Sequence, residues 1–96
     1  MYTKAVEEKL SIMTELLIII LNYDYSEAYD IIVKSQTYKW LKDLDYATMY
    51  DSPQANLSSI GEELRASNNP LGTKITDENI KKAMISKMDI KKEVIE

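Results

Sequence analysis

Residues 3–21 read TKAVEEKLSIMTELLIIIL, and this stretch decides the fold. Its apolar residues recur at intervals of three and four, which places one set of them along one side of an α-helix. That set is Val6, Leu10, Met13, Leu17 and Ile20. Because threonine is a suitable N-cap, we predict a helix from about Thr3 to Leu21. Its second half is apolar on all sides, so we expect a central helix that other helices surround, or one that leaves part of its surface to a second chain.

The composition argues against most classes of enzyme. The chain of 96 residues is long enough for one domain and contains neither cysteine nor histidine. It therefore lacks disulfides, thiolate chemistry, the commonest metal ligand and the usual acid–base group near neutral pH. We predict a protein that is not an enzyme and that holds no cofactor and no metal.

Charge and hydropathy bear on partners and location. The net charge is −4, from 12 basic and 16 acidic residues, which disfavours non-specific attraction to nucleic acid or to an anionic membrane. The longest apolar run, Leu16–Leu21, has six residues, whereas a membrane span needs roughly 20. Acidic residues precede this run, unlike those of a secretory signal. We expect a cytoplasmic protein with no membrane contact.

Residues 22–53 hold six of the seven tyrosines and the only tryptophan, in a chain without phenylalanine. Such a cluster is typical both of a small core and of a surface that meets a partner, and both interpretations stay open. Four apolar or aromatic residues keep the helical phase and are predicted core residues: Tyr25, Tyr29, Ile32 and Leu41. Five residues nearer Pro53, where that phase breaks down, form the predicted partner-binding surface: Tyr38, Trp40, Tyr46, Met49 and Tyr50.

Capping signals predict the helices within this aromatic stretch. Asp24, followed three residues later by Glu27, is a capping-box pattern and begins a second helix. Ser35 marks a break and the start of a third helix. The predicted inward side of this third helix consists of Tyr38, Leu41 and Leu44. Residues 47–51 are predicted to form a single helical turn.

The next helix begins with the clearest signal in the chain. Ser52 is a suitable N-cap, and Pro53 occupies the first helical position. A backbone N–H at that position would have no partner within the helix, so proline, which lacks this group, is tolerated there. This helix runs to about Ser67, with Leu57, Ile60 and Leu64 inward. Gly61 lies on the same side, so either a neighbouring helix crosses closely there or the glycine is tolerated near a helix end.

A loop over 68–76 precedes the last predicted helix, over 77–96. Thr76 is its cap, and its apolar side carries Ile80, Met84 and Met88. From Asp89 the apolar positions leave this stripe, which indicates either a separate short helix or a frayed end. We expect this C-terminal helix either to pack across the others or to reach a second chain.

The sequence therefore predicts an all-α fold: a single domain over 1–96, built as a small bundle of four to five helices around a central N-terminal helix. The core helices cover about 4–67. We expect a peripheral position for the C-terminal helix if it does not join them. No internal repeat or low-complexity segment divides the chain.

Two groups of acidic residues lack the arrangement that a chemical site requires. Glu62 and Glu63 are adjacent on a helix and point about 100° apart, so they do not converge as a catalytic pair. Asp43, Asp45 and Asp51 do not form an EF-hand loop, since that loop needs a glycine at its sixth position and an acid at its twelfth. We interpret all of these acids as solvated.

Nucleic-acid binding is the alternative function. Residues 26–44 form two predicted helices joined by a tight turn, and the second would present four polar residues to a groove. These are Gln36, Thr37, Lys39 and Lys42. Nearby acids and the lack of a glycine in the turn oppose this reading. The lysine-bearing C-terminal helix is a second basic patch, but interleaved acids offset it.

The segment AYDIIVKSQTYKWL at 28–41, followed by Tyr50 and Ser52-Pro53, resembles short helical proteins of unknown function encoded by Gram-positive bacteria and their mobile elements. The resemblance covers about a third of the chain and implies a bacterial or phage accessory protein. It implies no activity and no catalytic residue. The leading functional hypothesis is a non-enzymatic protein-interaction or regulatory module that binds another protein or forms a homodimer, with nucleic-acid binding as the alternative.

Overall fold

The computed structural model describes the backbone of residues 3–95 and the side chains of residues 3–88. These residues form helices, turns and loops and contain no strand, so the all-α prediction is confirmed. The predicted helical turn before Pro53 is a short helix, α4. In chain order the helices are α1 (Lys4–Leu21), α2 (Tyr25–Val33), α3 (Gln36–Lys42), α4 (Tyr46–Tyr50), α5 (Pro53–Ala66), the 3-10 helix η1 (Pro70–Thr73) and α6 (Asp77–Ile95).

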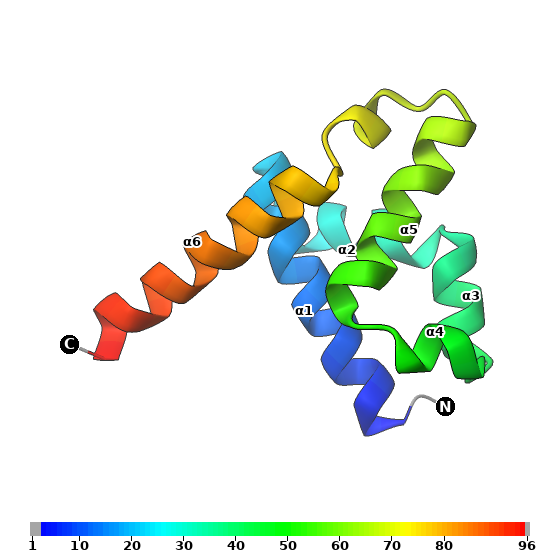
Figure 1. Cartoon of the computed structure of the whole chain (residues 1–96), viewed down its shortest axis with the longest axis horizontal. Coiled ribbons are helices and arrows are strands. Elements are labelled where there is room, and N and C mark those ends of the chain that lie inside the picture. Colours follow the sequence, from blue (N-terminus) through cyan, green and yellow to red (C-terminus); the bar gives the residue numbers. More distant parts are fainter. Residues whose placement is uncertain (1–2, 96) are drawn as a thin grey trace.

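Helix α1 is the centre of the molecule, as predicted. Helices α2, α5 and α6 all pack against it (Figure 1). Its buried residues are Val6, Leu10, Met13, Thr14, Leu16, Leu17 and Leu21. At its apolar end Ile18, Ile19 and Ile20 are only partly buried against this core. The other helices therefore cover most of the apolar end of α1 within one chain.

Local capping contacts begin the helices where the sequence predicts them. The Thr3 hydroxyl accepts the Val6 N–H at 3.2 Å, and the Ser35 hydroxyl accepts the Tyr38 N–H at 3.0 Å. Both hydrogen bonds of the Asp24–Glu27 capping box are present. The Ser52 hydroxyl accepts the Ala55 N–H at 3.1 Å. Each cap satisfies a backbone donor that the first turn of a helix leaves without an intrahelical partner.

Two predicted core residues lie at the surface instead. Tyr25 is exposed at the first position of α2 and stacks on Tyr29, with ring centroids 6.1 Å apart. The prediction that Tyr25 is a core residue is wrong, because the buried side of α2 consists of Ala28 and Ile32. Leu44 is exposed because α3 ends before it. The buried side of α3 consists of Thr37 and Leu41.

The core extends beyond residue 67, where the sequence predicted it to end. Ile75, Ile80 and Ala83 are all buried in the central cluster. Gly61 does permit a close approach, but its neighbour is the backbone before α6 and not a crossing helix. A methyl group at Gly61 would lie 2.1 Å from the Ile75 carbonyl oxygen.

Helix α6 begins at its predicted cap, where the Thr76 hydroxyl accepts the Asn79 N–H at 3.2 Å. It continues past Asp89 to Ile95, so no separate short helix forms there. Met88 is exposed instead of inward. Helix α6 extends beyond the other helices (Figure 1). Across residues 3–95, no helix has the length and apolar character that crossing a membrane requires.

Candidate protein-binding surface

Three of the five predicted partner-binding residues are strongly exposed. Tyr46 and Tyr50 lie one turn apart on α4, are each 81% exposed, and stack with ring centroids 6.1 Å apart. Trp40 on α3 is 47% exposed. Helices α3 and α4 pack against each other, at the opposite end of the molecule from the tip of α6 (Figure 1). Exposed aromatic rings are therefore concentrated on two neighbouring short helices.

Tyr38 and Met49 have a different position. Both are only partly buried, and both pack against the central core. The Lys42 ammonium lies 6.0 Å from the centre of the Tyr38 ring, a cation–π distance. Tyr38 and Met49 therefore connect α3 and α4 to the core, while Trp40, Tyr46 and Tyr50 are exposed.

Leu44 joins this surface, although the sequence assigned it to the core. It is 50% exposed and has a left-handed backbone with φ of 59°. Its N–H donates to the Leu41 carbonyl at 3.1 Å, and the next N–H, of Asp45, donates to the Trp40 carbonyl at 2.9 Å. These two bonds form a Schellman motif, whose left-handed position usually holds glycine or asparagine. We refer to Trp40, Leu44, Tyr46 and Tyr50 as the α3–α4 surface.

A hollow of about 440 Å³ adjoins Trp40. Its walls come from α3, α4, α5 and their connections, and its lining is mixed polar and apolar. The lining residues are Thr37, Trp40, Asp45, Ala47, Thr48, Asp51, Asn56 and Ser59. Asp45 and Asp51 bring two carboxylates to this lining, and the ammonium of Lys9 bonds to its Asn56 side chain.

Lys9, on the central helix α1, forms hydrogen bonds with three residues that line this hollow. Its ammonium donates to the Thr48 carbonyl at 3.2 Å, to the Asn56 side-chain oxygen at 2.9 Å and to the Asp51 carbonyl. Asn56 in turn donates from its amide to the Thr48 carbonyl at 3.1 Å. Burial lowers the pKa of Lys9, and the charge of Asp51 acts in the opposite direction. Sequence reasoning missed this role, because Lys9 and its partners are about forty positions apart.

Glu63 on α5 caps the start of α3. One carboxylate oxygen accepts the Gln36 N–H at 2.7 Å, and the other accepts the N–H and the hydroxyl of Thr37 at 3.0 and 2.6 Å. Glu63 is therefore a structural cap and not a solvated acid. Thr37 is buried, so the prediction that it faces a nucleic-acid groove is wrong.

The remaining acids of the region have structural roles or face solvent. One carboxylate oxygen of Asp45 accepts both the N–H and the hydroxyl of Thr48, at 3.1 and 2.8 Å, and so caps α4. Asp43 is exposed. Within the part of the chain that the structure describes, no three acidic side chains converge as a metal site would require.

The chain was compared with models of protein families, with curated proteins and with solved structures, and none of these comparisons finds a match. The resemblance to small Gram-positive bacterial proteins stays a prediction.

Proposed function

We propose that this protein is a non-enzymatic interaction module of the cytoplasm that binds a basic segment of a partner protein through its α3–α4 surface. The observation that carries the proposal is the exposure of Trp40, Leu44, Tyr46 and Tyr50 on two short helices that contact each other and on the connection between them. Tryptophan and tyrosine supply a large share of the free energy of binding at protein interfaces. Rings that are exposed in the free protein have that area available for a partner.

Leu44 strengthens the proposal because leucine disfavours the left-handed backbone conformation that this residue adopts. A left-handed conformation costs a residue other than glycine or asparagine about 1 kcal/mol. Burial does not offset this cost, since half of the side chain is exposed. Asn68 occupies the equivalent position after α5, where the N–H groups of Asn68 and Asn69 donate to Arg65 and Leu64 in the same pattern. A leucine in place of asparagine supports an apolar contact with another molecule.

The adjoining hollow supports a basic partner. A lysine or arginine side chain entering it would meet the carboxylates of Asp45 and Asp51 and the edge of the exposed Trp40 ring. Charge complementarity of this kind speeds association and excludes acidic partners.

The proposal is tested by selecting a random peptide library on the immobilised protein and measuring the binding of the selected peptides. We expect lysine or arginine next to an apolar residue in those peptides. Trp40 is the only tryptophan, so its fluorescence reports binding directly. Tyr46→Ala and Tyr50→Ala should each weaken binding about tenfold or more. Tyr25→Ala is the matched control, since Tyr25 is also an exposed tyrosine but belongs to α2.

Two results would reject the proposal. The first is selection of acidic peptides, and the second is equal binding by the wild type and by the Tyr46→Ala and Tyr50→Ala variants. Binding of a DNA duplex that weakens with salt and with Lys39→Glu or Lys42→Glu, but not with Tyr46→Ala, would favour the nucleic-acid alternative instead.

A further inference from the structure

Residues 36–51 comprise α3, α4 and the connection between them, and we refer to them as the α3–α4 segment. The structure describes this segment throughout, and Leu41 is its only buried apolar residue, whereas α1 buries six. The other buried side chains of the segment, Thr37 and Thr48, are polar. Opening a segment requires less free energy when less apolar area becomes newly exposed. Apolar packing therefore holds the α3–α4 segment less firmly than it holds the central helix.

Side chains from outside the segment hold both of its ends. At its start, one carboxylate oxygen of Glu63, on α5, accepts the N–H and the hydroxyl of Thr37 at 3.0 and 2.6 Å. At its end, the ammonium of Lys9, on α1, donates to the Thr48 carbonyl at 3.2 Å and to the Asp51 carbonyl. Two charged side chains thus connect the segment to two helices of the core.

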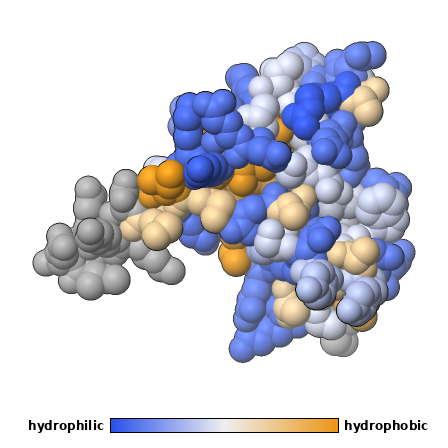
Figure 2. Space-filling view, viewed as in Figure 1, coloured by the Kyte–Doolittle hydropathy of each residue, from blue (hydrophilic) through white to orange (hydrophobic). Residues whose placement is uncertain are grey.

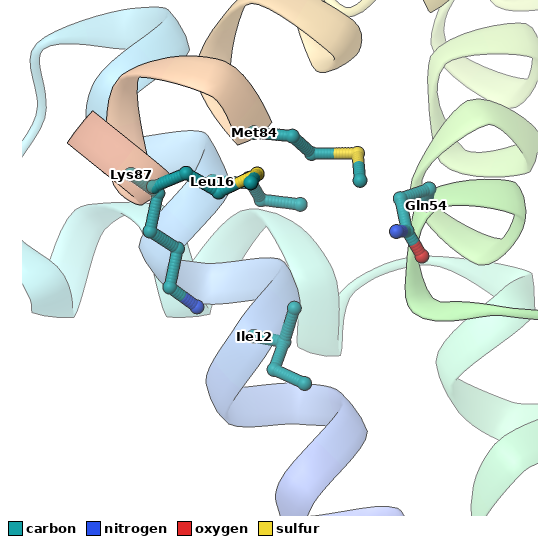
Figure 3. Close-up of a pocket in the computed structure, with 6 residues that line it drawn as sticks. Ile12, Leu16, Gln54, Met84 and Lys87 are labelled. Carbon is teal, nitrogen blue, oxygen red and sulfur yellow. The ribbon is translucent and has the colours of Figure 1, made fainter. Parts of the chain in front are cut away.

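Helix α6 is attached in a different way. Its residues Ile80 and Ala83 lie in the core, and Met84 is partly buried against it. Figure 2 shows hydrophobic residues gathering where α6 meets the other helices. Figure 3 shows Met84 of α6 and Leu16 of α1 on the wall of one hollow of about 220 Å³. Apolar side chains therefore join α6 to the central helix, and the α3–α4 segment has few of them.

Three further features favour opening of the α3–α4 segment. Its helices have only seven and five residues, too few to stay helical once they are released. Trp40, Tyr46 and Tyr50 are already exposed, so opening adds little to their contact with water. Leu44 would leave its left-handed backbone conformation, which is unfavourable for leucine. The opened segment would also gain backbone entropy.

We propose that the α3–α4 segment opens as one cooperative unit while α1, α2, α5 and α6 stay folded, and that the contacts of Glu63 and Lys9 hold it closed. Opening dismantles the α3–α4 surface, so a partner of that surface binds only the closed segment and shifts the equilibrium toward it. This control of binding rests on the proposed function. The opening itself is a property of the free protein.

Amide hydrogen exchange of the free, full chain tests the proposal, measured by NMR at several urea concentrations below the unfolding transition. The Asp45 N–H, which donates to the Trp40 carbonyl, and the Met49 N–H, which donates to the Asp45 carbonyl, report on the segment. Leu17 and Ile60, buried in α1 and α5, report on the core helices. The two segment amides should share one protection factor, about tenfold or more below that of the two core amides. It should also fall less steeply with urea, because local opening exposes less surface than global unfolding.

A core variant separates this opening from global unfolding. Ile80→Val removes one methylene-sized group from the core at α6. It should speed the exchange of the two core amides about threefold to tenfold. The exchange of the two segment amides should not change, because the core around Ile80 stays folded when the segment opens.

Variants of the two contacts test what holds the segment closed. Glu63→Gln and Lys9→Met should each speed the exchange of both segment amides by one common factor, about threefold or more. A change at the start of α3 should therefore be felt in α4, and a change at the end of α4 should be felt in α3. Glu62→Gln and Lys4→Met are the matched controls at exposed positions of the same helices and should leave both amides unchanged.

Three results would overturn the proposal. The first is equal protection and equal urea dependence of all four amides, since the segment would then open only by global unfolding. The second is an Ile80→Val variant that speeds the segment amides as much as the core amides. The third is a Glu63→Gln variant that speeds exchange at Asp45 but not at Met49, since α3 and α4 would then open separately. None of these measurements uses a ligand, so the opening and the peptide binding can each fail without the other.

Discussion

Glu63 and Thr37 join two helices that are distant in the sequence. A single carboxylate oxygen of Glu63 on α5 accepts both the backbone N–H of Thr37, at 3.0 Å, and its hydroxyl, at 2.6 Å. The second oxygen accepts the preceding N–H, of Gln36, at 2.7 Å. Helix α3 has only seven residues, and a helix that short is unstable in isolation. The position of α3, which carries Trp40, thus depends on a charge supplied by α5.

Replacing Glu63 should destabilise the protein. Glu63→Ala removes three hydrogen bonds to a charged acceptor and should lower the free energy of unfolding by about 2 kcal/mol. Glu63→Gln keeps one acceptor oxygen and should lose less. Urea unfolding followed by circular dichroism measures both. Glu62→Ala, at the exposed neighbouring position, is the control and should stay within about 0.5 kcal/mol of the wild type.

Lys9 should prove more important for stability than Lys4, the other lysine of α1. Lys9→Met keeps the aliphatic chain but leaves the oxygens of Thr48, Asp51 and Asn56 without this donor. We expect a loss of about 2 kcal/mol in the free energy of unfolding. Lys4→Met, at an exposed position of the same helix, should have little effect. Similar thermal unfolding of the two variants would contradict the assigned role of Lys9.

Gly61→Ala should be destabilising even though alanine favours a helix. The gain in helix propensity is about 1 kcal/mol. The added methyl group would lie 2.1 Å from the Ile75 carbonyl oxygen, so the backbone before α6 would have to move. We expect a net loss of about 2 kcal/mol or more, measured by urea unfolding. A variant more stable than the wild type would show that this close approach does not exist.

Leu44→Asn should raise stability and lower binding together. Asparagine tolerates the left-handed backbone, so the free energy of unfolding should rise by about 0.5–1 kcal/mol. Asn68→Leu makes the reverse change in the equivalent Schellman motif after α5 and should lower the free energy of unfolding by a similar amount. Selected basic peptides should bind Leu44→Asn more weakly than the wild type but Asn68→Leu equally well. A Leu44→Asn variant that binds as tightly as the wild type would remove Leu44 from the proposed surface.

Part of the candidate surface could be predicted from the sequence. The helical phase breaks down between Leu41 and Pro53, and the three aromatic residues of the α3–α4 surface lie near or within that interval. Leu44 could not be placed by periodicity, since nothing in the local sequence shows that α3 ends at Lys42, before it reaches Leu44. Tyr25 was assigned to the wrong side because the periodicity of a nine-residue helix leaves its rotation about its own axis poorly determined.

The sequence by itself determined that the chain is helical and where four of its helices begin. Each cap joins residues three positions apart, so Thr3, Asp24, Ser35 and Ser52 can be recognised without knowing the fold. Only the tertiary structure decided the roles of Lys9, Glu63 and Gly61. Their partners lie between 14 and 47 positions away. A lysine or glutamate on the polar side of a helix has the same local pattern whether it faces water or a distant helix, so packing alone decides between the two.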